Sequence, residues 1–172
     1  MLRLSADNAA ALSCELRHTS GPFLARRRAV IVLSLAASSV MGLITLYQTG
    51  ILRHLPEPQL SGLDADTVDA APEAYAILAT PDAALGLTSY AVTIVLAAMG
   101  RSDRAVHQPW VPLALAGKVG FDVLVGLKLT WDQWSKHRAF CSWCLLGSLA
   151  SFVSFPLVVP EARAALARLR QS

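Results

Sequence analysis

The chain is 172 residues long, with 54% hydrophobic and 16% charged residues and a mean hydropathy of +0.47. Soluble domains carry about 25% charged residues, so this composition excludes an ordinary soluble domain and indicates a membrane protein. The net charge of +3 is small and the basic residues gather near the chain ends and in one loop, which excludes a nucleic-acid-binding surface. Three cysteines are too few for a disulfide scaffold.

Four apolar segments follow one another along the chain. Each approaches the ~20 residues with which an α-helix crosses a bilayer, so we predict spans over residues 29–52, 83–100, 110–131 and 139–159. The expected fold is an all-α, integral membrane four-helix bundle, with a proline-rich, acidic, extracytoplasmic loop between helices 1 and 2. A transmembrane redox domain over residues 26–160 is flanked by cytoplasmic tails at 1–25 and 161–172. A short amphipathic helix is expected within the first tail.

The basic residues predict the orientation of these spans. Lys and Arg favour the cytoplasmic side of a membrane. With the N-terminus inside, only Arg53, Lys136 and Arg138 fall outside, whereas the inside holds Arg3, Arg17, Arg26, Arg27, Arg28, Arg101, Arg104, Arg163, Arg168 and Arg170. The loop and the start of the fourth span are therefore expected on the extracytoplasmic side, in a bacterium the outer face of the inner membrane. That compartment is oxidising, which suits a redox-active thiol pair.

The third span is the least apolar, because it contains Lys118 and Asp122. Residues four apart share one face of a helix. Charges in a bilayer normally pair or face the protein interior. We expect an ion pair inside the bundle; a proton path or a pocket lining is the alternative.

The strongest local motif is F-C-S-W-C, residues 140–144, at the start of the fourth span. Cys141 and Cys144 share one helix face, which suits a reversible disulfide. The helix N-terminus and the basic residues at 136–138 both favour the thiolate, the form that attacks a disulfide or a quinone ring. A structural pair or half of a zinc site is the alternative, although zinc normally takes four ligands and only His137 is close in sequence. No metal is expected.

Two segments together resemble the vitamin K epoxide reductase family. Residues 133–146, Q-W-S-K-H-R-A-F-C-S-W-C-L-L, are similar to the junction of the last two helices in its bacterial members. Residues 79–90, A-T-P-D-A-A-L-G-L-T-S-Y, are similar to the start of their second helix. The resemblance implies a thiol–quinone oxidoreductase, an enzyme that passes electrons from extracytoplasmic protein thiols through the CxxC disulfide to ubiquinone or menaquinone and so forms disulfide bonds.

The resemblance also implies roles for particular residues. Cys144 is the catalytic cysteine nearer the quinone, and Cys141 exchanges with an incoming thiol. Asp82 occupies a position near a quinone oxygen, although an N-cap of the second span is the more favoured interpretation. The predicted quinone contacts are Asp82, Pro81, Phe140, Trp143 and Ser148.

The chain departs from the family pattern in its first loop. Family members usually carry two loop cysteines that pass electrons to the CxxC, but residues 53–82 contain none, and the second would fall near Asp66. A serine that commonly follows them is also missing, since Ala70 and Ala71 occupy that region. We therefore expect a thioredoxin-like protein to react directly with Cys141, near the membrane surface. The acidic residues Asp64, Asp66, Asp69 and Glu73 are expected to dock this partner or to form a lid. A non-catalytic membrane assembly or quinone-binding protein that kept the fold is the alternative.

Overall fold

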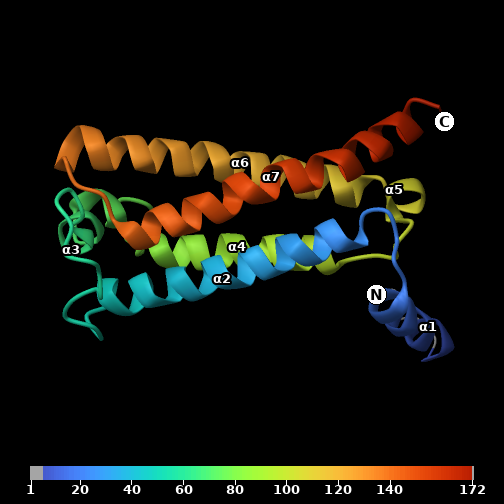
Figure 1. Ribbon diagram of the computed structural model, residues 1–172, viewed down its shortest axis with the longest axis horizontal. Coiled ribbons are helices and arrows are strands. Elements are labelled where there is room, and N and C mark those ends of the chain that lie inside the picture. The colour runs from blue at the N-terminus through green and yellow to red at the C-terminus, as the bar shows by residue number, and fades with distance from the viewer. Residues whose placement is uncertain (1–5, 172) are drawn as a thin grey trace.

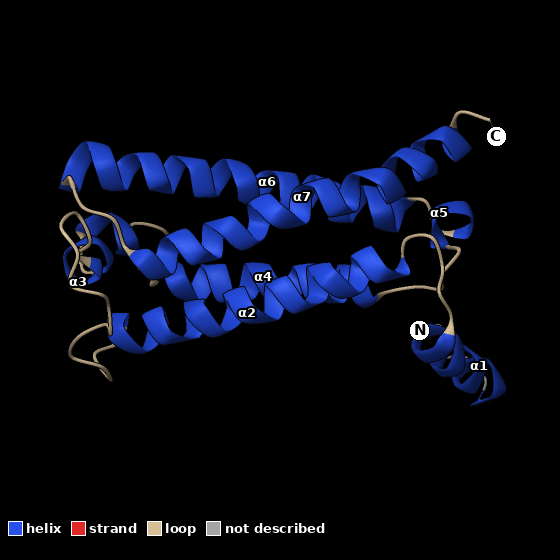
Figure 2. Cartoon of the chain, in the orientation of Figure 1, coloured by secondary structure: helices blue, strands red, loops and turns tan. Residues whose placement is uncertain are grey.

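The computed structural model describes residues 6–171, and the regular elements among them are all helical (Figure 2). Residues 1–5, which include Arg3 of the expected first tail, and residue 172 lie outside the described part. In chain order the elements are α1 (Ala6–His18), α2 (Leu24–Gln48), α3 (Ala65–Asp69), η1 (Pro72–Tyr75), α4 (Asp82–Ala98), α5 (Arg104–His107), α6 (Trp110–Asp132), η2 (Gln133–His137) and α7 (Ser142–Leu169). The expected all-helical architecture is confirmed.

Four helices lie side by side along the long axis of the molecule (Figure 1). Helix α2 packs against α4 and α7, and α6 packs against α7 and α4. Three segments, Leu24–Gln48, Trp110–His137 and Ser142–Leu169, are long and apolar enough to cross a membrane. Helix α4 is apolar but has only 17 residues, so its crossing of the membrane stays a prediction.

Helix α7 is longer than the expected fourth span, which ends at residue 159. It continues through Pro156 and Pro160 to Leu169. Its buried face carries small residues, among them Gly147, Ala150 and Ser154. Small side chains let neighbouring helix backbones approach closely, which supports packing between apolar helices.

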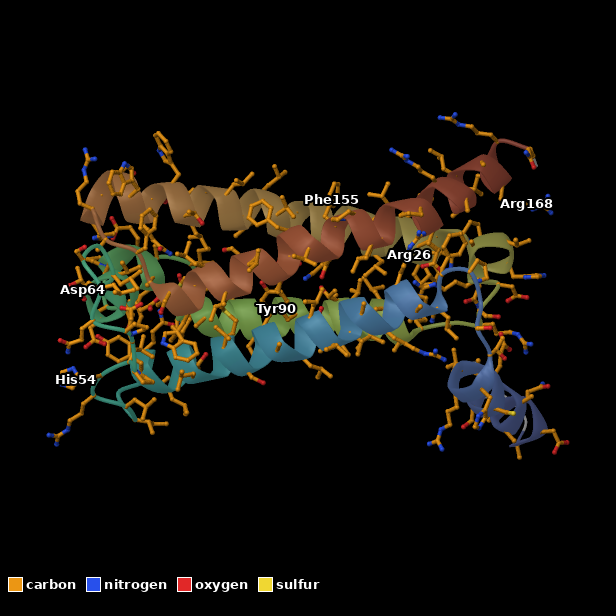
Figure 3. The ribbon with its side chains drawn as sticks, viewed as in Figure 1. Arg26, His54, Asp64, Tyr90, Phe155 and Arg168 are labelled. Carbon is orange, nitrogen blue, oxygen red and sulfur yellow. The ribbon has the colours of Figure 1, made fainter. Side chains whose placement is uncertain are left out.

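The two ends of the molecule are built differently. Helices α1 and α5 and both chain ends lie at one end, and α3 lies at the other with the loop that follows α2 (Figure 1). Arg26 and Arg168 lie toward the first end, and His54 and Asp64 toward the second (Figure 3). The loop is joined to the link before α7 by backbone hydrogen bonds from the Phe140 N–H to the Gly62 carbonyl and back from the Asp64 N–H to the Phe140 carbonyl.

Two buried arginines hold the end that carries the termini. The Arg27 guanidinium donates to five backbone carbonyls at and after the end of α4, those of residues 97–101. The last carbonyls of a helix lack partners within it and favour a cation. Arg104 binds both carboxylate oxygens of Glu161 at 2.8 Å, and both side chains are buried. The sequence counts these arginines among the cytoplasmic charges. In the structure the side chains of both are buried within the fold.

Removing Arg104 leaves the Glu161 carboxylate buried without its cationic partner. We expect Arg104→Ala to lower the free energy of unfolding by roughly 3–5 kcal/mol, the usual effect of breaking a buried ion pair. Arg101→Ala is the matched control, because the side chain of Arg101 is 59% exposed where it pairs with Glu15; its effect is expected to stay below about 1 kcal/mol. Unfolding of the purified protein in detergent measures both, and equal effects would contradict a structural role for the buried pair.

Candidate functional site

The start of α7 sets the position of the two cysteines of the CxxC motif, Cys141 and Cys144. Cys141 is the N-cap residue, and its Sγ accepts a hydrogen bond from the backbone N–H of Cys144 at 3.1 Å. The N–H groups of Cys141 and Ser142 donate to Gln133 Oε1 at 3.1 Å and to Glu57 Oε1 at 2.6 Å. N–H groups at the start of a helix have no partner within the helix. These three acceptors therefore fix the helix end on which the free thiols sit.

The loop between α2 and α4 covers this helix end. The carboxylate that binds α7 also binds α3, since Glu57 Oε2 accepts the Ala65 N–H at 2.6 Å. The Trp143 indole N–H donates to the Pro56 carbonyl at 2.8 Å. Side chains from the loop and from α7 thus hold the cover in place from both sides.

The cover limits access to the thiols. Cys141 is expected to meet a partner thiol near the membrane surface, but its exposed fraction is 0%. In the conformation described the loop lies over the helix start, so a partner thiol can reach the Cys141 sulfur only after the loop moves. Cys144 is only partly buried, so the two thiols differ in access.

A loop carboxylate, Asp69, lies against the cysteine pair. The Cys144 thiol donates to Asp69 Oδ1 at 3.2 Å, and the Sγ atoms of both cysteines and an Asp69 oxygen lie within 4.8 Å of one another. Asp69 is only 2% exposed. Within residues 6–171 its second oxygen, Oδ2, has no hydrogen-bond partner although it is buried. The sequence groups Asp69 with the loop carboxylates that are expected to dock a partner or to form a lid, and the burial of Asp69 contradicts the docking role.

Burial raises the pKa of the Asp69 carboxyl from its usual value near 4 to about 6. Hydrogen bonds from the thiols of Cys141 and Cys144 act in the opposite direction, and the carboxyls of Asp82 and Glu57 raise the pKa further by charge repulsion. The site therefore contains a carboxyl that can gain and lose a proton near neutral pH.

Gln48, at the end of α2, connects Asp69 to the start of α4. Its Nε2 donates to Asp82 Oδ1 at 2.7 Å and to the Asp69 carbonyl at 3.2 Å, and its Oε1 accepts the Ala83 N–H at 3.2 Å. The expectation that Asp82 caps this helix is wrong. Asp82 is the first helical residue, Pro81 is the N-cap without a side-chain bond, and Gln48 provides the acceptor instead.

A cavity of about 660 Å³ lies between the four long helices next to the cysteine pair. Drug-sized ligands occupy cavities of roughly 300–1,000 Å³ with mostly apolar walls and a few polar groups. Cys144, Asp69 and Asp82 contribute polar atoms to this wall, as do Tyr90 and Ser148. The apolar part of the lining includes Met41, Ile44, Leu85, Phe121 and Val125. The lining also contains charged residues, namely Glu73, Asp122, Lys128, Asp132 and Lys136.

The predicted site residues divide into two groups around this cavity. Cys144, Asp82 and Ser148 line it. Phe140 stacks on Trp134, with ring centroids 5.6 Å apart, and neither it nor Pro81 or Trp143 is part of the lining. The structure thus brings one cysteine, one carboxyl and one hydroxyl of the predicted set to a common space, with Cys141 buried behind them.

Tyr90 lies farther from the loop end of the bundle than Asp64 (Figure 3), and Asp122 of α6 lines the same cavity as Tyr90. Lys118 donates to Asp122 and to Thr93 Oγ1, which confirms the expected ion pair. The second oxygen of Asp122 accepts from Ser89 at 2.9 Å, and the Tyr90 hydroxyl donates to the Gly147 carbonyl at 2.6 Å. Each of these polar groups has a hydrogen-bond partner within the protein. Ser89, Tyr90 and Asp122 therefore line the cavity without an unpaired polar group among them.

The donors Asp69, Cys141 and Cys144 also have the geometry of a metal site. Structural zinc takes four protein ligands, and this group has three among the described residues. Two thiols, a proton-accepting carboxyl and an adjoining apolar cavity are instead the parts needed to transfer electrons and protons to an apolar acceptor.

A family model described as the vitamin K epoxide reductase family matches residues 28–159, which is most of the chain. The match includes the loop, Asp69 and both cysteines of the CxxC. A search among curated proteins finds no match for the chain.

Burying the Asp69 charge lowers stability above its pKa. The folded protein binds this proton below about pH 6, whereas the unfolded chain binds it only below about pH 4. The cost is thus absent well below pH 4, grows between about pH 4 and pH 6, and amounts to about 2–3 kcal/mol at higher pH. We expect Asp69→Asn to unfold at a higher temperature than the wild type at pH 8, with a smaller difference at pH 5. A difference that stays constant between pH 5 and pH 8 would contradict the raised pKa.

Proposed function

Because the chain belongs to the vitamin K epoxide reductase family, we propose that it is a membrane thiol–quinone oxidoreductase that generates disulfide bonds. Family membership alone implies an oxidoreductase of the vitamin K epoxide reductase type. The observation that carries the finer proposal is that Cys144 lies in the wall of a 660 Å³ cavity with Cys141 directly behind it. A thiol that contacts an apolar cavity in a membrane protein can deliver electrons to a lipid-soluble acceptor.

A quinone, as the acceptor, takes up two electrons and two protons to become a quinol. In this proposal Cys144 faces the quinone, and Asp82 and Ser148 orient its oxygens from the cavity wall. Cys141 closes the disulfide with Cys144 and later reacts with the incoming thiol. The apolar part of the lining matches the apolar ring.

The electron donor is proposed to be a thioredoxin-like protein on the extracytoplasmic side. Because Cys141 is buried, the loop that carries Glu57 has to move before a partner thiol can reach its sulfur. The loop contains no cysteine to carry the electrons instead. In this proposal the partner thiol reacts with Cys141 directly after the loop has opened, whereas loop thiols carry the electrons in other members of the family.

All four long helices are proposed to cross the membrane, with the cysteine pair on the extracytoplasmic side. The support is the excess of Lys and Arg in the segments at the end that carries α1, α5 and the chain ends. The end that carries α3 holds the acidic loop (Figure 1). In a bacterium this arrangement places the protein in the inner membrane, with the dithiol facing the oxidising compartment.

Under this proposal, quinone reduction requires both cysteines of the CxxC motif. We expect Cys141→Ser and Cys144→Ser each to reduce dithiothreitol-driven quinone reduction by at least about 100-fold, because a serine hydroxyl does not supply a nucleophile comparable to a thiolate. Cys14→Ser is the matched control and retains the wild-type rate, since Cys14 lies in α1 at the far end of the molecule. Absorbance of the quinone with purified protein in detergent measures all three. Full activity in Cys144→Ser removes the mechanism, and an inactive wild type favours the non-catalytic alternative.

The orientation is tested with single cysteines in a chain from which the native three have been removed. Leu60, in the loop, is 63% exposed, so we expect Leu60→Cys to react with a membrane-impermeant maleimide added to intact cells. A cysteine restored at position 14 is exposed in the structure and is expected to react only after the cells are opened. The reverse pattern would overturn the proposed orientation.

A further inference from the structure

The Asp69 carboxylate is buried with few hydrogen-bond partners, and a purely structural role does not explain this environment. Buried carboxylates are normally fully hydrogen-bonded or paired with a cation. Oδ1 accepts from the Cys144 thiol, the Cys141 thiol also acts on the carboxyl, and Oδ2 has no hydrogen-bond partner within residues 6–171. The contacts that hold α3 and α4 in place use the Asp69 backbone carbonyl, through Gln48, and not its carboxylate. The side chain is therefore costly to bury and is directed at a reacting sulfur.

Asp69 lines two neighbouring spaces. One is the large cavity, and the other is a smaller pocket of about 60 Å³ that has room for a few water molecules. Cys144 is common to both spaces. A proton on Asp69 can therefore reach either the wall of the large cavity or the water-sized pocket.

We propose that Asp69 is a catalytic residue that accepts the proton of the Cys144 thiol when the dithiol is oxidised. The inference rests on the proposed function, and it assigns the proton transfer that this function requires. Thiols react as thiolates, so the S–H bond of Cys144 has to break before or during electron transfer. Asp69 Oδ1, 3.2 Å from this sulfur, is positioned to receive the proton.

The step balances in atoms and electrons. The Cys144 S–H bond breaks and an O–H bond forms on Asp69. An S–S bond then forms between Cys144 and Cys141 while two electrons pass to the quinone. The proton released by the Cys141 thiol and the proton held by Asp69 complete the quinol. Asp69 returns to the carboxylate, the thiols are oxidised and the quinone is reduced.

The protonation state of Asp69 sets the direction of the pH dependence. Only the carboxylate can accept a proton, and burial raises the pKa of Asp69 to about 6, so the rate falls as the pH falls through this value. Other titratable or charged groups surround Asp69 from the loop, η1, α4, α6, η2 and α7. Those that line one or both spaces with it are Glu73, Asp82, Tyr90, Asp122, Lys128, Asp132, Lys136, His137 and Cys144. Glu57 and Cys141 also act on the pKa of Asp69.

The test is a single turnover with the full-length, pre-reduced protein and a short-chain quinone in the absence of oxygen, between pH 5 and pH 9. We expect Asp69→Asn to slow disulfide formation about 100-fold at pH 7, the lower range for loss of a proton-transfer group. The difference in rate between wild type and Asp69→Asn becomes smaller toward pH 9, where hydroxide removes the thiol proton. The decrease in rate below pH 6 is expected to be absent in Asp69→Asn. Asp69→Glu keeps a carboxyl and is expected to retain the fall at acid pH.

Asp66→Asn is the matched control, because it removes the same charge from the same short helix. Its carboxylate binds His54 and the Leu55 N–H, away from the thiols. We expect this variant to keep the wild-type pH profile. Equal profiles for wild type and Asp69→Asn would overturn the role of Asp69 and leave the proposed function standing.

A second measurement does not use quinone. In the Cys141→Ser variant, the rate at which iodoacetamide alkylates Cys144 reports the fraction of Cys144 present as thiolate. We expect the double variant Cys141→Ser, Asp69→Asn to show a different pH profile of this rate. If wild type fails to reduce quinone but this profile shifts, the proposed function is wrong and the proton coupling stands. If Asp69→Asn leaves the profile unchanged, the coupling is wrong, whatever the result with quinone.

Discussion

The structure depends on how the backbone N–H groups at the start of α7 find partners inside the protein. An apolar environment provides no water to satisfy them, and each unpaired group costs free energy. Three acceptors from three parts of the chain meet this need: Glu57 from the loop, Gln133 from the link after α6, and the sulfur of Cys141 itself. The same bonds that complete the helix hold the loop over the cysteine pair and separate a buried thiol from one that reaches the cavity.

This constraint explains how a loop without cysteines still takes part in the site. Carboxylates provide many of its fixed contacts, since Glu57 joins α3 to α7 and Asp66 binds the Leu55 N–H. Asp69 follows at the end of α3, where the fold directs it at Cys144. Under the proposal, the loop contributes Asp69 as the proton acceptor and has to open before a partner thiol reaches Cys141, because it also covers Cys141.

The sequence predicted those features that depend on local pattern. Apolar runs indicated the four long helices, although α7 continues ten residues beyond the expected end at 159. The CxxC spacing predicted that the Cys141 and Cys144 sulfurs lie close together, and the four-residue separation indicated the Lys118–Asp122 ion pair. Residues whose role depends on contacts distant in sequence were missed, because an isolated acid or amide in a loop or at a helix end has no periodic signal. They are Gln48, Glu57, Asp69, Arg104 and Glu161.

The central claim is that electrons leave the Cys141–Cys144 dithiol for a quinone in the adjoining cavity. Its most direct measurement is the stoichiometry of one anaerobic turnover, in which fully reduced protein is mixed with excess quinone and the products are counted by absorbance and by mass spectrometry of unreduced peptides. The account predicts one quinol and one Cys141–Cys144 disulfide per protein, with Cys14 still a thiol. Quinol without this disulfide, or a disulfide that contains Cys14, would contradict it.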